Sequence, residues 1–316
     1  MTRLQLAQFS NQAIMFAAIV YALAMLAHIV EWAATRSTAP GRILVGPDGA
    51  ELPSAGSDLG GAERPYRVDL WGRYGIALTM VGLLLNAAGV LARGLAADRV
   101  PWGNMYEFTI TGCVATVLTY LIMLRFQPIR WLGLPVTALV VVLLMLAVLL
   151  LDVPAAPLVP ALHSYWLYIH VTAAMLATGS FTVGALASVL FLVRNRAERR
   201  GTAGTGISAR LPEADVIDTF AYRVHAFGFP VWTFAALIAG PIWARYAWGR
   251  YWGWDPKEVW AFVTWVAYAA YLHARATAGW RGKGAAILAL VGFAALLYNF
   301  VGINLWGGGL HSYAGK

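Results

Sequence analysis

Eight long apolar segments, separated by shorter polar stretches, constrain the fold of this chain more than any other feature. A helix needs about 20 largely apolar residues to cross about 30 Å of hydrocarbon, and each segment has about that length. Hydrophobic residues make up 60% of the chain and charged residues only 12%, roughly half the charged share of a soluble domain. We therefore expect an all-α, polytopic membrane helix bundle with about eight spans, at about 12–34, 73–92, 105–124, 131–151, 165–193, 226–245, 258–276 and 285–305.

The whole chain, 1–316, is predicted to form a single membrane domain. No stretch outside the spans is long enough for a second domain, and no internal repeat of roughly 20–50 residues is apparent. The first span has no small-residue cleavage pattern before Glu31, which predicts a retained helix rather than a signal peptide.

The net charge of +8 could indicate a nucleic-acid partner, but the basic residues are spread over several loops between the spans. Cytoplasmic loops of membrane proteins carry an excess of lysine and arginine. With both termini outside, sixteen of the 23 lysines and arginines fall on the inner side. The charges therefore predict an orientation in a membrane and no nucleic-acid partner, and they place Trp248–Trp260 on the outer face.

Cys113 is the sole cysteine and lies inside the third span, so a disulfide within the chain is excluded. The chain also lacks a Cys-x-x-Cys-His motif, which would attach haem covalently. Free cysteines are often buried, and we expect Cys113 to be a small packing residue.

The segment "WGRYWGWDPKEVW", Trp248–Trp260, holds four tryptophans, a tyrosine, an aspartate, a lysine and a glutamate. It is too polar to cross a bilayer and too aromatic for an ordinary linker. Such a segment predicts a broad aromatic surface at the edge of the membrane, suited to a flat and partly polar partner.

Three histidines are predicted to lie near this segment. His163 and His170 stand at the outer start of the fifth span, seven residues apart, so they share a helix face at about 10 Å. His311 follows the eighth span after Gly307, Gly308 and Gly309, which let the chain turn back over the membrane.

Two further histidines lie deeper. His273 is about 22 Å below the outer surface on a straight seventh helix, and His28 reaches a similar depth on the first. The two could serve a second site, although a histidine inside a span is more often bonded to a neighbouring carbonyl. His225 precedes the sixth span and is predicted to be a solvated boundary residue.

Imidazole binds zinc, copper or iron, but zinc and copper sites usually add cysteine or carboxylate ligands and need no broad aromatic walls. Haem iron accepts two axial histidines, and several indole rings can cover a porphyrin. We therefore expect a haem held flat at the membrane surface. Arg245 and Arg250 are candidates to face its propionates.

The stretch "WGRYWGWDPKEVWAFVTWVAYAAYLHAR" resembles the tryptophan-rich WWD signature of the CcsA (ResC) cytochrome c biogenesis proteins of System II. The segments "PWGNMYEF", "HSYWLYIHV" and "GWRGKGAAI" and the glycine-rich end of the chain also match in order. The resemblance implies a CcsA-like core over 73–316, with its WWD loop at 246–258.

The resemblance implies a subunit of a holocytochrome c synthase (haem lyase), with no catalytic residue of its own. It would carry haem b, as cargo and substrate, to the outer face for thioether attachment to the CxxCH motif of an apocytochrome c. The implied partners are a CcsB/ResB membrane subunit (Ccs1-like in plastids), the apocytochrome c and thiol reductant proteins.

The resemblance also implies a set of site residues. His170 and His311 would be the axial ligands of the outer haem, with His163 in its vicinity. His273 would ligate a transmembrane haem whose opposite ligand is on the partner, and His28 is the candidate if the chain works alone. The porphyrin platform is assigned to Trp248, Trp252, Trp254 and Asp255, although Asp255 before Pro256 equally predicts a helix N-cap.

Two other functions fit the same residues. The chain could be a haem exporter or chaperone that delivers haem to a carrier protein, or a b-type cytochrome subunit that keeps haem as an electron carrier. The "DPKE" continuation and the "GLHSY" end favour the synthase. The expected location is a bacterial plasma membrane, with the WWD loop on the outer face.

Overall fold

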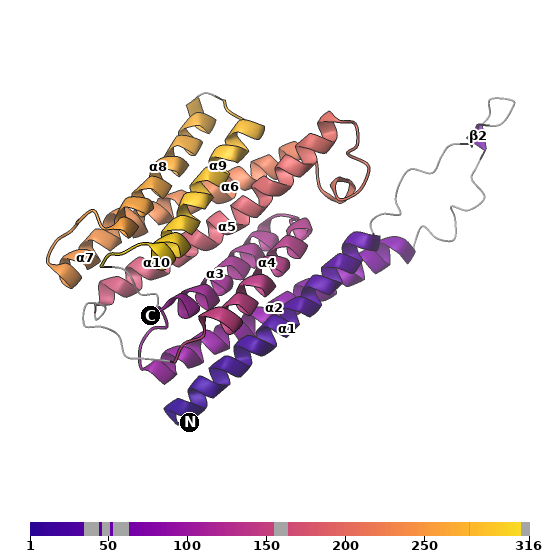
Figure 1. The fold of residues 1–316 in the computed structure, drawn as a ribbon. Coiled ribbons are helices and arrows are strands. Elements are labelled where there is room, and N and C mark those ends of the chain that lie inside the picture. Colours follow the sequence, from indigo (N-terminus) through magenta and orange to yellow (C-terminus); the bar gives the residue numbers. More distant parts are fainter. Residues whose placement is uncertain (35–43, 46–50, 53–62, 155–163, 278, 311–316) are drawn as a thin grey trace.

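A computed structural model describes residues 1–34, 44–45, 51–52, 63–154, 164–277 and 279–310 of the chain. Long helices lie side by side and alternate in direction (Figure 1), which confirms the all-α bundle. The α-helices are α1 (Arg3–Ala34), α2 (Glu63–Ala97), α3 (Met105–Phe126), α4 (Gly133–Leu146), α5 (Tyr165–Arg199), α6 (Ala214–Thr233), α7 (Gly240–Trp248), α8 (Pro256–Thr277), α9 (Lys283–Leu297) and α10 (Ile303–Trp306).

Shorter elements extend or connect these helices. Three π-helical segments continue α4, α6 and α9: η3 (Ala147–Leu151), η6 (Phe234–Ala239) and η7 (Tyr298–Gly302). The 3₁₀ segments are η2 (Arg130–Leu132) and η5 (Ser208–Arg210), and two-residue strands β1 (Leu44–Val45) and β2 (Glu51–Leu52) pair antiparallel. We call the end where α7 ends and α8 begins the tryptophan end, and the opposite end the arginine end.

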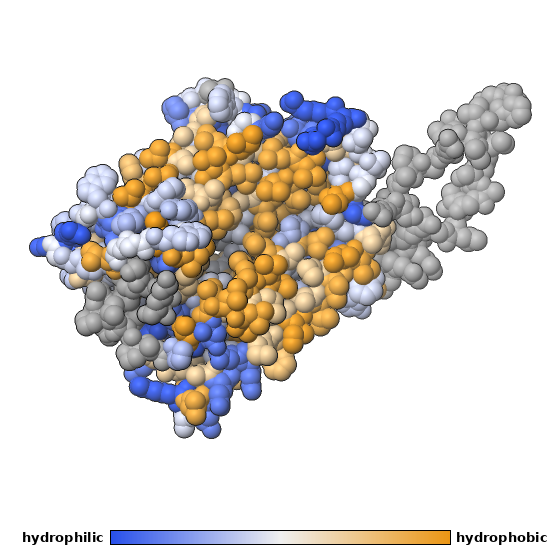
Figure 2. Space-filling model, in the orientation of Figure 1, coloured by the Kyte–Doolittle hydropathy of each residue, from blue (hydrophilic) through white to orange (hydrophobic). Residues whose placement is uncertain are grey.

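Seven helices in the described part of the chain are long and apolar enough to span a membrane, so the protein is a multi-pass membrane protein. Figure 2 shows a broad apolar band on one face of the bundle, with hydrophilic residues towards its ends. The eighth predicted span, 258–276, forms most of α8, which has 22 residues. Polar residues at both ends of α8 (Lys257, Glu258, His273 and Arg275), together with its tryptophans and tyrosines, lower its mean hydropathy, so α8 is not among the seven.

The first two helices are longer than their predicted spans. α1 begins at Arg3 rather than near residue 12, and α2 runs from Glu63 to Ala97 rather than over 73–92. Hydropathy marks only the part of a helix inside hydrocarbon, and both helices continue into polar sequence beyond it. Arg3 pairs with Asp98 at 3.0 Å where the two helices meet at the tryptophan end.

Glycines on α2 allow α1 to approach closely. A Cβ built on Gly82 would lie 2.7 Å from the ring of Tyr21, and one on Gly89 would lie 2.7 Å from Ile14. Small residues provide such contacts in membranes, where helix association depends on packing and not on expulsion of water. Cys113 is fully buried in the adjoining core, which confirms its predicted packing role.

A cluster of charges joins α1, α2 and η2 at the arginine end. Arg130 pairs with Glu31 at 2.9 Å and with Asp69 at 2.7 Å. His28 lies 3.0 Å from the same Glu31. These contacts hold the turn between α3 and α4 against the first two helices.

A second cluster shapes the tryptophan end. Glu107 of α3 is fully buried and pairs with Arg93 at 3.1 Å and Arg99 at 2.6 Å. It also accepts a hydrogen bond from the Gly103 backbone N–H at 2.7 Å, while Asn104 caps α3. Glu107 therefore fixes the loop at 98–104 through its contacts with Arg99 and Gly103. Trp102 in this loop lines a cavity.

Candidate functional site

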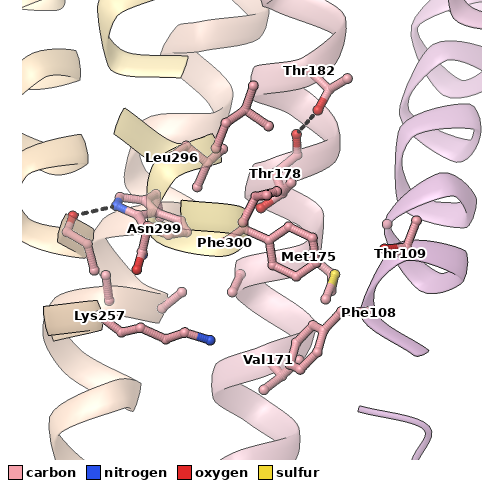
Figure 3. A pocket seen from close by; sticks show the side chains of 18 of the residues that line it. Phe108, Thr109, Val171, Met175, Thr178, Thr182, Lys257, Leu296, Asn299 and Phe300 are labelled. Carbon is pink, nitrogen blue, oxygen red and sulfur yellow. Dashed lines mark hydrogen bonds between the residues drawn. The ribbon is translucent and has the colours of Figure 1, made fainter. Parts of the chain in front are cut away.

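A cavity of about 630 Å³ opens among α3, α4, α5, α8, α9 and the α6–α7 helix. Cofactor sites commonly have volumes of about 300–1,000 Å³. Its wall is chiefly apolar, and it extends from Trp102 and Trp252 at the tryptophan end to Val189 and Leu290 deeper in the bundle. Figure 3 shows side chains from α3, α5, α8 and α9 turned into this space.

All three π-helical segments border the cavity, through residues such as Leu150, Ala235 and Phe300. A π-turn widens a helix locally and is frequent at functional sites. In η6 the widening has a local cause, because Pro241 has no backbone N–H and its ring crowds the carbonyl one turn earlier. The sequence alone did not predict these segments.

His170 is the one histidine among the described residues that lines the cavity. It stands in the second turn of α5, whose start is capped by the Ser164 hydroxyl. Its Nδ1 lies 2.9 Å from the Ala235 carbonyl oxygen in η6 and donates to it. Because Gly240 lacks a side chain there, the ring can pack against η6; a Cβ would lie 3.1 Å from it.

This hydrogen bond determines the chemistry of His170. Donation from Nδ1 selects the tautomer with its lone pair on Nε2, and a backbone acceptor of this kind is typical of metal-ligating histidines. The ring is also stacked parallel to Trp243, with centroids 5.9 Å apart and planes 4° apart. His170 is therefore held in one orientation beside the cavity.

Asp255 and Glu258 order the WWD loop through a reciprocal cap. Asp255 Oδ1 accepts from the Lys257 N–H at 3.1 Å, and Glu258 Oε2 accepts from the Asp255 N–H at 3.1 Å. This is a capping box, which starts α8 firmly. Glu258 also accepts from the Gly253 N–H at 2.8 Å, so the loop is tied to the helix that follows it.

The other oxygen of Asp255 binds the end of the chain. Asp255 Oδ2 accepts from the Leu310 N–H at 2.6 Å. Gly309 adopts a φ of +149°, and a Cβ there would lie 2.4 Å from the same oxygen, so only glycine fits this approach. The segment before His311 is therefore joined to the WWD loop. The structure confirms the predicted N-cap role of Asp255.

The predicted tryptophans have different positions. Trp252 lines the cavity. Trp248 packs edge-on against Trp243 at 4.7 Å, and Trp254 is 71% exposed and edge-on to Trp252 at 5.9 Å. Among the described residues, only Trp252 of the three assigned tryptophans borders the space itself.

Lys257 and Asn299 line the cavity (Figure 3). Neither was predicted from the sequence as a site residue. Desolvation at this site outweighs the nearby charge of Asp255 and lowers the pKa of Lys257 to about 8. Arg245 and Arg250, the candidates for the propionates, are exposed and are not part of the cavity wall. In the sequence, the one hint of a role for Lys257 is its place two residues after the N-cap Asp255.

The two deep histidines, His28 and His273, are too far apart to bind one ligand together. His28 lies in α1 and His273 in α8, at opposite edges of the bundle (Figure 1). His28 is fully buried, and Cβ atoms on Gly75 and Gly133 would lie 2.6 and 2.4 Å from its ring. His273 is exposed on the surface of α8, near the arginine end.

His225 was predicted to be solvated, and this prediction is wrong. Its side chain is fully buried in α6, with Tyr268 at 5.2 Å and Tyr271 at 5.4 Å between ring centroids. The error arose because the charged end of α6 extends below this residue, where Asp218 pairs with Arg275 at 2.7 Å. His163 and His311 lie outside the described residues.

No group of three or more His, Cys, Asp or Glu side chains in the described part of the chain could hold a metal ion. A single oriented imidazole beside an aromatic and apolar cavity suits a ligand that brings most of its own coordination, as a metalloporphyrin does. Asn299 Oδ1 is buried without a hydrogen-bond partner, which also indicates that a partly polar ligand fits the cavity.

Comparison with known proteins places these residues in a family. The family model described as Cytochrome C assembly protein matches residues 102–311, which include every element around the cavity. This chain belongs to that family. The match supports a role for this chain in cytochrome c maturation, and it confirms the resemblance to CcsA proteins.

Individual members of the cytochrome c assembly family are similar over most of their length. A protein of a Synechococcus species, named cytochrome c biogenesis protein CcsA, is 34% identical over 308 residues, covering 80% of this chain and 89% of its own. Proteins of the same name from Synechococcus elongatus and Pyropia yezoensis are 36% and 35% identical, covering 76% and 74% of this chain and 86% of each relative.

Proposed function

We propose that this chain binds haem b in the cavity at its tryptophan end and presents it for attachment to an apocytochrome c. The observation that carries the proposal is His170, whose Nδ1 donates to the Ala235 carbonyl, so the ring is held in the tautomer that can bind iron through Nε2. His311 is proposed as the second axial ligand, because Asp255 holds the residue bonded to it at the same loop.

The chemistry requires positioning more than a protein nucleophile. In thioether formation the cysteine S–H bond breaks, and a C–S bond and a C–H bond form across a haem vinyl group, with no net oxidation. The thiolate is the reactive form of the cysteine. The chain would hold the ring against Trp252 and orient its iron through imidazoles that the histidine of the substrate motif can replace. Correct placement can lower such a barrier by roughly 7–11 kcal/mol.

A partner subunit of the CcsB/ResB type is part of the proposal. His273 is exposed on the surface of α8, and a histidine on a membrane helix is costly unless it pairs or ligates. A haem between His273 and a partner histidine would meet that need. His28, enclosed by α2 and α4, is proposed to be structural. Thiol reductant proteins would keep the apocytochrome cysteines reduced, and we place the tryptophan end on the outer face of a bacterial plasma membrane.

Membership of the cytochrome c assembly family favours maturation over a permanent electron carrier. The separation of His28 and His273 also argues against a b-type cytochrome built on that pair within one chain. Delivery to a carrier protein would use the same cavity, and only the acceptor would differ.

The test compares haem spectra of the purified chain and its His170→Gln variant, both co-purified with the partner. Glutamine can donate to the Ala235 carbonyl but cannot replace imidazole on iron. We expect the bis-imidazole Soret band of the cavity haem to weaken, and added imidazole to restore it. A Soret band of unchanged size and position in His170→Gln would refute the assignment, and a colourless wild-type protein would refute haem binding altogether.

A further inference from the structure

The wall of the cavity is chiefly apolar, yet one lysine or arginine of the described part of the chain, Lys257, lines it. Figure 3 shows the Lys257 side chain extending from the start of α8 into the space beside Val171. None of the ion pairs formed among the described residues includes Lys257. An ammonium group in apolar surroundings is costly when no carboxylate pairs with it directly.

The nearby carboxylates already have structural roles. Asp255 accepts from the backbone N–H groups of Lys257 and Leu310, and Glu258 accepts from those of Gly253 and Asp255. Their hydrogen-bonding capacity is therefore directed to the backbone of the WWD loop and the chain end. Desolvation remains the largest influence on the pKa of Lys257, which is lowered despite the charge of Asp255.

A second polar group meets the same space from η7. The Oδ1 atom of Asn299 is buried and has no hydrogen-bond partner, while its residue lines the cavity. Buried polar atoms are nearly always satisfied, and an exception commonly marks the place of a ligand or an ordered water. A carboxamide and an ammonium from two different helices thus belong to the few polar groups of a chiefly apolar wall, together with His170, Glu258 and several threonines. Such groups fix the orientation of a ligand.

We propose that Lys257 and Asn299 form the subsite that receives a propionate carboxylate of the porphyrin. This inference rests on the proposed function, since it orients the same haem. Lys257 would donate a charge-assisted hydrogen bond to the carboxylate. Rotation of the Asn299 carboxamide by about 180° would exchange Oδ1 for the NH₂ group, which could then donate to the same carboxylate. The vinyl-bearing side of the ring then faces away from Lys257, which determines the edge that an apocytochrome cysteine can reach.

The arginines of the loop are weaker candidates for this role. Arg245 is exposed, donates to the Gly249 carbonyl oxygen and lies over the Tyr251 ring. Arg250 is exposed and packs over Gly253, where a Cβ would lie 2.4 Å from its guanidinium. Arg250 therefore offers a matched control: a cation in the same loop that does not line the cavity.

The experiment titrates the protein, purified with its partner, with iron protoporphyrin IX and with its dimethyl ester, and follows the Soret band. The ester has the same ring and iron but no carboxylates. We expect the wild type to bind the diacid about 10- to 100-fold more tightly than the diester, the usual worth of a charge-assisted hydrogen bond. In Lys257→Met this ratio should fall towards one, mainly through weaker binding of the diacid.

Further variants separate charge from packing. Lys257→Arg should keep most of the preference, Asn299→Leu should reduce it less than Lys257→Met, and Arg250→Met should leave it unchanged. A preference that survives Lys257→Met, or that disappears in Arg250→Met, would overturn the subsite. If the wild type binds neither porphyrin, the proposed function fails and the subsite with it. If both bind through His170 with equal affinity, the subsite alone fails.

Discussion

Asp255 links the WWD loop to the end of the chain, and replacing it with asparagine separates its two roles. Oδ1 accepts from the Lys257 N–H at 3.1 Å and Oδ2 from the Leu310 N–H at 2.6 Å. Asparagine has one oxygen and one NH₂ group. If the oxygen accepts from the Lys257 N–H, the NH₂ group faces the Leu310 N–H and that hydrogen bond is lost; in the other rotamer the N-cap is lost instead. A hydrogen bond to a charged acceptor contributes about 1.5–3 kcal/mol, while an N-cap contributes about 1 kcal/mol.

We therefore expect Asp255→Asn to leave α8 folded but to lower the population of the docked chain end about 10- to 100-fold. Because His311 is bonded to Leu310, the haem at the proposed outer site would lose its second imidazole. The assay is the haem spectrum of the purified protein, with and without added imidazole, together with hydrogen exchange at the Leu310 amide. Imidazole should restore the six-coordinate spectrum, and the Leu310 amide should exchange faster.

The control is Asp215→Asn, which removes an exposed acid from the first turn of α6 at the arginine end and should change neither measurement. Asp255→Ala should act more strongly than Asp255→Asn, since it also removes the cap of α8. A spectrum and an exchange rate equal to the wild type in Asp255→Asn would show that the Leu310 contact does not hold the chain end.

Four other predictions concern stability and topology. Glu107→Gln removes the buried carboxylate that pairs with Arg93 and Arg99, so we expect a loss of about 3–5 kcal/mol, visible as earlier thermal unfolding in detergent. Gly82→Val would force its side chain into Tyr21 and should destabilise by about 1–3 kcal/mol by the same assay. Cys113 is fully buried and should resist a maleimide until the protein unfolds. In a Cys113→Ala background, Thr205→Cys should react with an impermeant maleimide only from the cytoplasmic side.

The sequence predicted the helices well where hydrocarbon alone determines them. The segments at 105–124 and 165–193 fall within α3 and α5, because apolar length is a direct consequence of crossing a bilayer. It predicted the ends of α1 and α2 poorly, since polar sequence can continue a helix beyond the membrane. It also did not predict η3, η6 and η7, of which only η6 has a local cause, in Pro241.

The candidate site was predicted in part. His170, Trp252 and the cap formed by Asp255 could be recognised from motif and local pattern. Lys257 was not assigned, because its place two residues after Asp255 does not indicate which way its side chain turns; only the structure shows that it lines the cavity. His225 was misplaced because it precedes the predicted sixth span, yet α6 begins earlier and the ring is enclosed by α5 and α8.

By itself, the sequence determined a multi-pass helical membrane protein with an aromatic loop and histidines near one end, because hydropathy and local capping depend on neighbouring residues. Only the tertiary structure decided which of those side chains share one space. The carbonyl that orients His170 is 65 residues away, and the hydrogen bond that Leu310 donates to Asp255 crosses 55 residues. Contacts over such separations depend on how helices pack, and no local pattern encodes them.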